Sequence, residues 1–131
     1  MAVGINVIDN QHQEMFIRYN RLVDAIQNGG VKQELASIIS FLQDYSIDHF
    51  GTEETLMDRY SYPDAPAHKA QHATFVRDFA AAKKQLETSG VSADLAVGIV
   101  NKLGEWLMRH IGDTDKRLGA YVRMALMRKA A

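Results

Sequence analysis

All five histidines of this chain fall in or beside the apolar stripe of a segment with helical periodicity. They are His12, His49, His68, His72 and His110. A buried neutral imidazole needs a hydrogen-bond partner or a metal, because an unmet polar group in the interior costs about 1–3 kcal/mol. Taken singly, each histidine is explained as a core residue with such a partner. Taken together, their spacing points to a shared metal site.

Two pairs of candidate ligands have a spacing that suits a regular helix. His68 and His72 are four residues apart, which separates them by about 40° around a helix and one turn along it. Both imidazoles can therefore reach the same cation. His49 and Glu53 have the same spacing and offer one nitrogen and one carboxylate oxygen to a common point.

A third pair needs an irregular helix. His110 and Asp115 are five residues apart, which puts them about 140° apart on a regular helix. They converge only if the helix ends or distorts between them, and Gly112 supplies a place for that change. With His12 from the first helical segment, every segment offers ligands to the interior, as helix bundles with metal sites do.

The ligand types indicate the metal. Imidazole and carboxylate suit iron, manganese or zinc, and the absence of cysteine disfavours a soft-metal site. Five imidazoles and two carboxylates are too many for one ion and indicate two ions. If both are roughly six-coordinate iron and each carboxylate bridges, one further oxide or hydroxide bridge leaves a single position open.

The elements that position these residues can be read from apolar periodicity. Four segments repeat apolar residues at helical period, over about 9–28, 32–60, 66–88 and 92–111. Glycine or proline follows the first three segments, and Ser92 is a suitable N-cap for the fourth. No stretch alternates at period two for long. The sequence therefore predicts an all-α, up-down-up-down four-helix bundle, in a single domain spanning 1–131.

A basic and apolar stretch follows the fourth segment and carries Leu118, Tyr121, Val122 and Leu126. We predict that it forms a short C-terminal helical segment. Two interpretations stand beside each other. It is either a last helix packed on the bundle, or an output helix that leads to a protein partner or an adjoining signalling domain.

Composition excludes several classes of protein. The length of 131 residues fits one domain, and the net charge of −1 gives no electrostatic footprint for nucleic acid. Without cysteine there are no disulfides, iron–sulfur clusters or thiol nucleophiles. The sequence also shows no signal peptide and no stretch apolar enough to span a membrane. We therefore expect a cytoplasmic protein.

The candidate ligands resemble the pattern of the hemerythrin family, and the resemblance covers nearly the whole chain. Four motifs carry it in the family's order: Val3-Gly4-Ile5 with Ile8-Asp9-Asn10-Gln11-His12; His49-Phe50-Gly51-Thr52-Glu53-Glu54 followed by Met57; His68-x-x-x-His72; and His110-x-x-x-x-Asp115. A bundle without such a site would rarely combine four motifs at these spacings.

The resemblance implies two iron ions with an oxo or hydroxo bridge, and reversible binding of molecular oxygen without catalysis. It assigns His68, His72 and His110 to one iron, His12 and His49 to the other iron with the open position, and Glu53 and Asp115 as bridges. Trp106, Leu107 and Ile111 match positions that wall the oxygen site. Ordinary core packing is the alternative for these three, and both roles can hold together.

Two other functions stay open. A sensory domain would pass an oxygen- or redox-dependent change to a partner through the C-terminal segment, and a di-iron oxidase or peroxidase would convert a substrate. Against the enzyme, the chain has no Glu-x-x-His motif and offers five nitrogens to two carboxylates. Glu54 and Asp9 are candidate partners for ligand histidines, or solvated or capping residues. Leu118 departs from the family, which often has tyrosine there.

Overall fold

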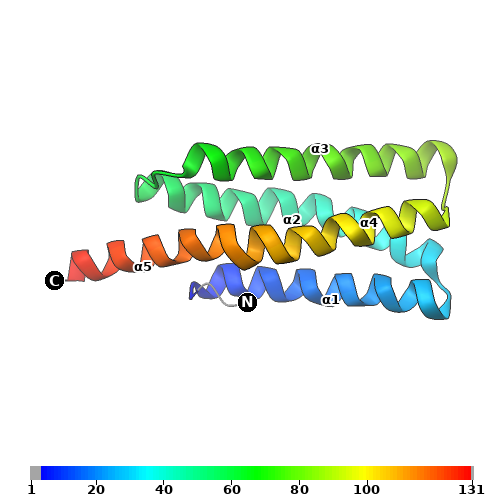
Figure 1. Cartoon of the computed structure of the whole chain (residues 1–131), viewed down its shortest axis with the longest axis horizontal. Coiled ribbons are helices and arrows are strands. Elements are labelled where there is room, and N and C mark those ends of the chain that lie inside the picture. The colour runs from blue at the N-terminus through cyan, green and yellow to red at the C-terminus, as the bar shows by residue number, and fades with distance from the viewer. Residues whose placement is uncertain (1–3, 131) are drawn as a thin grey trace.

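The chain forms helices along almost its whole length. The computed structural model describes residues 4–130, so Val3 of the first motif and both chain ends lie outside the described residues. The elements are α1 (Asn6–Asn28), α2 (Val31–Arg59), α3 (Ala65–Ser89), α4 (Ala93–Glu105), the π-helix η1 (Trp106–Asp115) and α5 (Lys116–Ala130). No strand occurs within the described range. The prediction of an all-α, up-down-up-down four-helix bundle is confirmed (Figure 1).

The turns follow from the residues that break the helical pattern. Gly29 and Gly30 have φ angles of +93° and +88°, a region that side chains with a Cβ avoid, so α2 can start directly after α1. The predicted cap is also present, because the Ser92 hydroxyl accepts a hydrogen bond from the Leu95 N–H at 3.0 Å. Short turns of this kind keep neighbouring helices antiparallel.

The fourth helix differs from its predicted bounds. We expected an end near residue 111, but α4, η1 and α5 continue without a break to Ala130 (Figure 1). A π-helix takes i→i+5 hydrogen bonds in place of i→i+4, so the chain absorbs the irregularity around Gly112 as wider turns. The helix axis is therefore kept where the sequence pattern suggested a stop.

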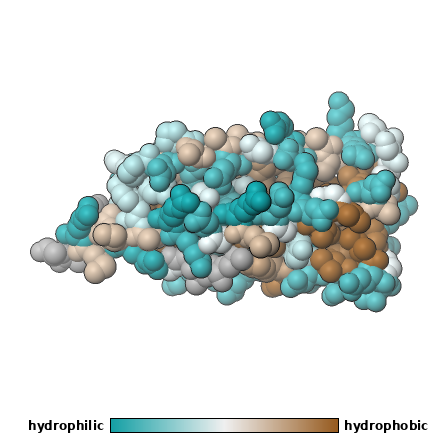
Figure 2. Space-filling model, viewed as in Figure 1, coloured by the Kyte–Doolittle hydropathy of each residue, from teal (hydrophilic) through white to brown (hydrophobic). Residues whose placement is uncertain are grey.

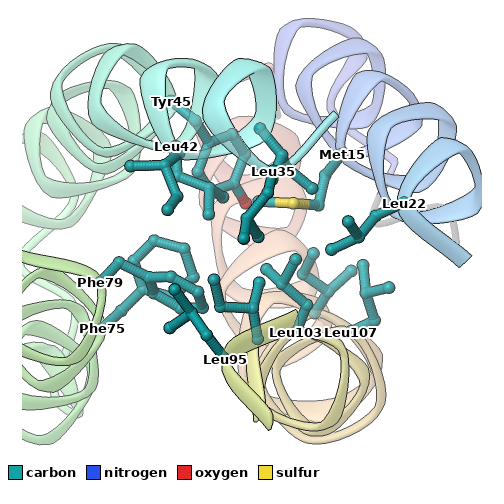
Figure 3. Packing of buried hydrophobic residues seen from close by; sticks show 14 of the residues in the cluster. Met15, Leu22, Leu35, Leu42, Tyr45, Phe75, Phe79, Leu95, Leu103 and Leu107 are labelled. Carbon is teal, nitrogen blue, oxygen red and sulfur yellow. The ribbon is translucent and has the colours of Figure 1, made fainter. Parts of the chain in front are cut away.

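Two apolar clusters fill the bundle, one on each side of the histidines. The larger cluster contains Met15, Leu35 and Leu103, which are fully buried where the four helices converge (Figure 3). The smaller cluster joins Met57 and Tyr62 to the first turns of α5. Along α2 and the fourth helix, the candidate ligands lie between residues of the two clusters. The fold thus encloses the candidate ligands in apolar surroundings.

The two halves of α5 differ in their environment. Leu118, which stands where the family often has tyrosine, is 0% exposed, and Val122 is 2% exposed. The Tyr121 hydroxyl donates to the Tyr60 carbonyl at 2.8 Å. Further along, Met124 and Met127 are 56% and 71% exposed, and Figure 1 shows α5 extending past the turn between α2 and α3. The packed-helix interpretation fits the first half, and a partner for the second half stays a prediction.

On the face in Figure 2 hydrophilic side chains predominate, with an apolar area at the end of the bundle where α4 begins. None of the helices in the described range is long and apolar enough to cross a membrane.

Candidate metal centre

The seven predicted ligands are all buried, with exposed fractions of 2% or less. The values are His12 2%, His49 0%, Glu53 0%, His68 1%, His72 2%, His110 2% and Asp115 1%. Among the other charged side chains whose burial the structure describes, up to Arg128, none is buried. Such a concentration of polar groups in one interior site needs a cation or a closed hydrogen-bond network to offset the loss of hydration.

One group of ligand atoms contains three histidines. The Nε2 atoms of His68 and His110 each lie 2.9 Å from Asp115 Oδ1 and 3.2 Å from each other. His72 Nε2 lies 3.0 Å from Glu53 Oε1. Each of these five residues offers an atom within 4.8 Å of all the others. This is enough nitrogen and oxygen for one metal ion.

A second group contains two histidines. His12 Nε2 lies 2.8 Å from Asp115 Oδ2 and 3.2 Å from His49 Nε2. His49 Nε2 lies 3.3 Å from Glu53 Oε1. Asp115 therefore turns Oδ1 toward the three-histidine group and Oδ2 toward the two-histidine group. A carboxylate placed in this way can bridge two ions.

The π-helix η1 makes the second carboxylate available. Because the wider turns of a π-helix bring residues five apart close together, His110 and Asp115 come onto the same side of the fourth helix. The distance of 2.9 Å between His110 Nε2 and Asp115 Oδ1 results from this geometry. The distortion expected around Gly112 is present, but it extends over all ten residues of η1.

Side chains behind three of the histidines fix the direction of their inner nitrogens. The Nδ1–H of His49 donates to Gln11 Oε1 at 2.6 Å, and that of His110 donates to Gln71 Oε1 at 2.6 Å. His72 Nδ1 lies 3.0 Å from Glu54 Oε2. Amide and carboxylate oxygens accept, so each Nδ1 carries a hydrogen, and Nε2 is left as the nitrogen that can bind a metal ion once it has lost its own proton.

Sequence reasoning placed Glu54 among the candidate partners but missed both glutamines. Gln11 and Gln71 each come directly before a ligand histidine in the sequence, and each bonds a histidine of a neighbouring helix. The repeated Gln-His dipeptide was the available signal. Asp9, the other candidate partner, accepts a hydrogen bond from the Gly4 N–H at 3.2 Å.

The donor set fits a pair of metal ions. Glu53 Oε2 is buried without a hydrogen-bond partner. His12 Nε2 and His49 Nε2, which face each other at 3.2 Å, are both possible ligands. Burial, the largest influence, lowers the pKa of His49 and His68, but hydrogen bonds and charge from Asp115 and Glu53 outweigh it and raise both to about 9. The cluster thus attracts positive charge, which protons or metal ions can supply.

The pKa values of the two carboxylates are shifted in the opposite direction, below their ordinary values. Burial and mutual repulsion raise the pKa of Glu53, but hydrogen bonds from His110, His49 and His68 outweigh them and lower it below its ordinary value. Burial also raises the pKa of Asp115, but hydrogen bonds from the histidines lower it by more. The pKa of Asp115 therefore lies well below its ordinary value. Both carboxylates therefore stay charged inside the bundle.

Comparison with known proteins agrees with this geometry. The family model of the hemerythrin HHE cation binding domain matches residues 3–122. The chain belongs to the hemerythrin family. Among its hemerythrin relatives, a bacteriohemerythrin of Pseudomonas aeruginosa (strain LESB58) is 36% identical over 88% of this chain and 72% of the relative. A bacteriohemerythrin of Methylococcus capsulatus (strain Bath) is 33% identical over 90% of this chain and 88% of the relative.

A solved structure of the family has the same fold. The crystal structure of a hemerythrin leucine-to-alanine mutant superimposes with a TM-score of 0.75 at 28% identity, covering 92% of this chain and 89% of that chain. The buried cluster of histidine, glutamate and aspartate is therefore a hemerythrin-type di-metal site.

Aromatic and aliphatic side chains wall this hemerythrin site. Trp106 stacks on His110 with ring centres 3.7 Å apart, and Phe50 stacks on His72 at 4.0 Å. Leu107 and Ile111 are 4% and 0% exposed and belong to the larger apolar cluster, against which Trp106 packs. The structure thus places the three predicted pocket residues beside the ligands on the core side.

A groove with both apolar and charged side chains in its lining, Trp106 among them, borders one side of the site. It has a volume of about 920 Å³, lies between α3 and the fourth helix, and reaches His68, His110 and Gln71. Charged residues line it further out, among them Asp78 and Arg109. His12 and His49 are not part of its lining.

Proposed function

We propose that this protein binds molecular oxygen reversibly at a pair of iron ions, as an oxygen carrier, store or delivery protein. The observation that carries the proposal is the arrangement around Asp115, whose two oxygens face two separate groups of inward-pointing histidine nitrogens. Five nitrogens against two carboxylates also favour binding over the carboxylate-rich sites of ferritin-like di-iron oxidases.

In this proposal His68, His72 and His110 hold one iron, and His12 and His49 hold the other. Glu53 and Asp115 would supply oxygen ligands to both ions, and an oxide or hydroxide would complete the centre. When bound, the iron pair supplies the electrons that oxygen binding needs. A cytoplasmic location stays a prediction.

The chain's own residues orient the ligands and exclude water. Gln11, Gln71 and Glu54 hold three imidazoles in the tautomer that turns Nε2 inward. Trp106, Leu107 and Ile111 keep the core side of the site apolar. Exclusion of water matters because water and external protons would help reduced oxygen to escape and leave the irons oxidised.

A sensory role is the second candidate, and one structural observation favours it. The same continuous helix carries His110 and Asp115 at the site and Met124 and Met127 on the exposed end of α5. A change in the position of the ligands would act on a helix that extends beyond the bundle (Figure 1). Oxygen-dependent exposure or proteolysis of this end would support the sensor.

The optical spectrum of the iron-loaded protein tests the proposal. The spectrum is recorded without oxygen, after addition of oxygen and after its removal. A visible charge-transfer band that appears with oxygen and fades on its removal is expected. Immediate and irreversible conversion to an oxidised spectrum would contradict the carrier and favour a redox sensor or an oxidase.

A further inference from the structure

Two polar groups are buried in the larger apolar cluster without a hydrogen-bond partner: the Tyr45 hydroxyl and the Trp106 indole N–H. Tyr45 as a whole is 5% exposed. An unpaired buried polar group lowers stability, and phenylalanine would avoid that loss. The neighbouring positions Phe50, Phe75 and Phe79 do carry phenylalanine. The hydroxyl of Tyr45 therefore needs a reason other than packing.

Both groups lie beside the metal ligands. Tyr45 precedes His49 by one turn of α2 and stacks on its ring, with centres 4.6 Å apart and an interplanar angle of 19°. Trp106 precedes His110 by one turn and stacks on it at 3.7 Å and 9°. Figure 3 shows Tyr45 pointing from α2 into the middle of the bundle, toward Met15 and Leu35. The two groups thus approach the core side of the site from opposite helices.

Both groups are hydrogen-bond donors. A tyrosine hydroxyl carries its hydrogen below about pH 10 and can donate it. An indole N–H can only donate. The surrounding side chains of Phe50, Phe75 and Met15 offer no strong acceptor. The Trp106 indole lies close enough to act on the Tyr45 hydroxyl oxygen, but it cannot accept the hydroxyl hydrogen. That hydrogen has no acceptor among these side chains, so an acceptor would have to come from outside the chain.

We propose that the Tyr45 hydroxyl and the Trp106 N–H donate hydrogen bonds to the outer atom of a small, electron-rich ligand taken up on the core side of the centre. The ligand class comprises diatomic and triatomic species that carry or gain negative charge, such as oxygen or azide. The proposal rests on the proposed function, because the metal pair would hold the other end of the ligand. The core side of the centre would then offer two donors to a negative ligand in otherwise apolar surroundings.

Azide binding tests this role without depending on reversible oxygen binding. The iron-loaded, oxidised protein is titrated with sodium azide, as wild type, Tyr45→Phe and Tyr121→Phe. Loss of one ligand hydrogen bond raises the dissociation constant about three- to tenfold in Tyr45→Phe. Tyr121→Phe removes a hydroxyl that bonds the Tyr60 carbonyl far from the ligand space, so its affinity should equal that of wild type. Equal affinities in all three proteins, or no azide binding by the loaded wild type, would overturn the proposal.

Two further readouts separate a ligand contact from a structural role. The antisymmetric stretch of bound azide should shift between H₂O and D₂O in wild type, but not in Tyr45→Phe. Metal-free Tyr45→Phe should melt at the same temperature as the metal-free wild type or higher, because the substitution removes an unpaired group. A clearly lower melting temperature would show that the hydroxyl is paired inside the protein, and would overturn the proposal.

The two proposals can fail separately. If oxygen binding proves irreversible while Tyr45→Phe weakens azide binding, the carrier function fails and the role of Tyr45 stands. If oxygen binds reversibly while azide affinity is unchanged in Tyr45→Phe, only the role of Tyr45 fails.

Discussion

The two sides of the metal centre share their carboxylates but differ in their surroundings. On the three-histidine side, His110 is held by Gln71, and both residues line the groove between α3 and the fourth helix, which charged side chains also line. On the two-histidine side, His49 lies under Tyr45 and beside the apolar cluster. One side thus borders water and charge, and the other borders hydrocarbon. In our proposal the small ligand is bound on the side that borders the apolar cluster, away from the groove.

Removing the carboxylate that both sides share should have the strongest effect on metal binding. Asp115→Ala deletes the carboxylate that faces both histidine groups, so we expect iron content to fall from about two ions per chain to near zero. Elemental analysis measures this, and circular dichroism checks that the helices persist. Asp113→Ala, two residues away in an exposed ion pair with Arg117, is the control and should keep its iron. Full iron content in Asp115→Ala would contradict the bridge.

Removing one histidine from each side should affect the two sides unequally. His49→Ala leaves a single histidine on its side, so one iron is lost or weakened while helix content is largely kept. His72→Ala leaves His68 and His110 in place and should retain more iron at the same free iron concentration. Iron stoichiometry and colour like wild type in His49→Ala would refute the ligand assignment.

The glutamines behind the histidines offer a subtler change on each side. Gln11→Ala and Gln71→Ala each free an Nδ1–H that now donates at 2.6 Å. Loss of such a partner typically weakens metal binding about 10- to 100-fold. Competition with a coloured chelator measures the affinity, and Gln43→Ala, whose amide bonds exposed Lys83, is the control. An affinity unchanged in both variants would mean that packing alone orients the rings.

The pH dependence of stability should differ between the metal-free and the loaded protein. In the metal-free protein the pKa of His49 and His68 is raised to about 9. Their contribution is full below the unfolded value of about 6.5 and is lost as pH rises through about 9. The melting temperature of metal-free protein should therefore fall over this range. Iron holds the imidazoles unprotonated, so the loaded protein should show no such fall, and parallel curves would contradict this account.

A smaller change is expected when the apolar cluster beside the two-histidine group is altered. Leu107 is 4% exposed in the apolar cluster, and Leu107→Ala should admit water and speed oxidation of the oxygenated protein severalfold. Met108→Ala, at a position 73% exposed on the groove side of the same helix, is the matched control. Stopped-flow decay of the visible band gives both rates. Equal rates in the two variants would show that Leu107 does not keep the site dry.

The regular parts of the centre were predictable from spacing, because residues four apart on an α-helix share a face. His68 with His72, and His49 with Glu53, lie together as expected. The pair His110 and Asp115 was predicted to need a distortion, but its extent depends on tertiary packing that local sequence does not encode. Gln11 and Gln71 were missed for a related reason, since contacts between helices depend on how each helix is rotated. The assignment of iron to individual ligands stays a prediction.

The π-helix η1 also turns the number of residues in the fourth helix into a structural constraint. Each residue of an α-helix advances about 100° around the axis, so the wide turns before Lys116 set the direction in which every later side chain points. Leu118 and Val122 face Met57 and Tyr62 only in this register. Deleting Gly112 would restore regular turns and rotate that apolar face away from its partners. A single-residue deletion would then damage a packing contact well beyond the site, although no residue of that contact had changed.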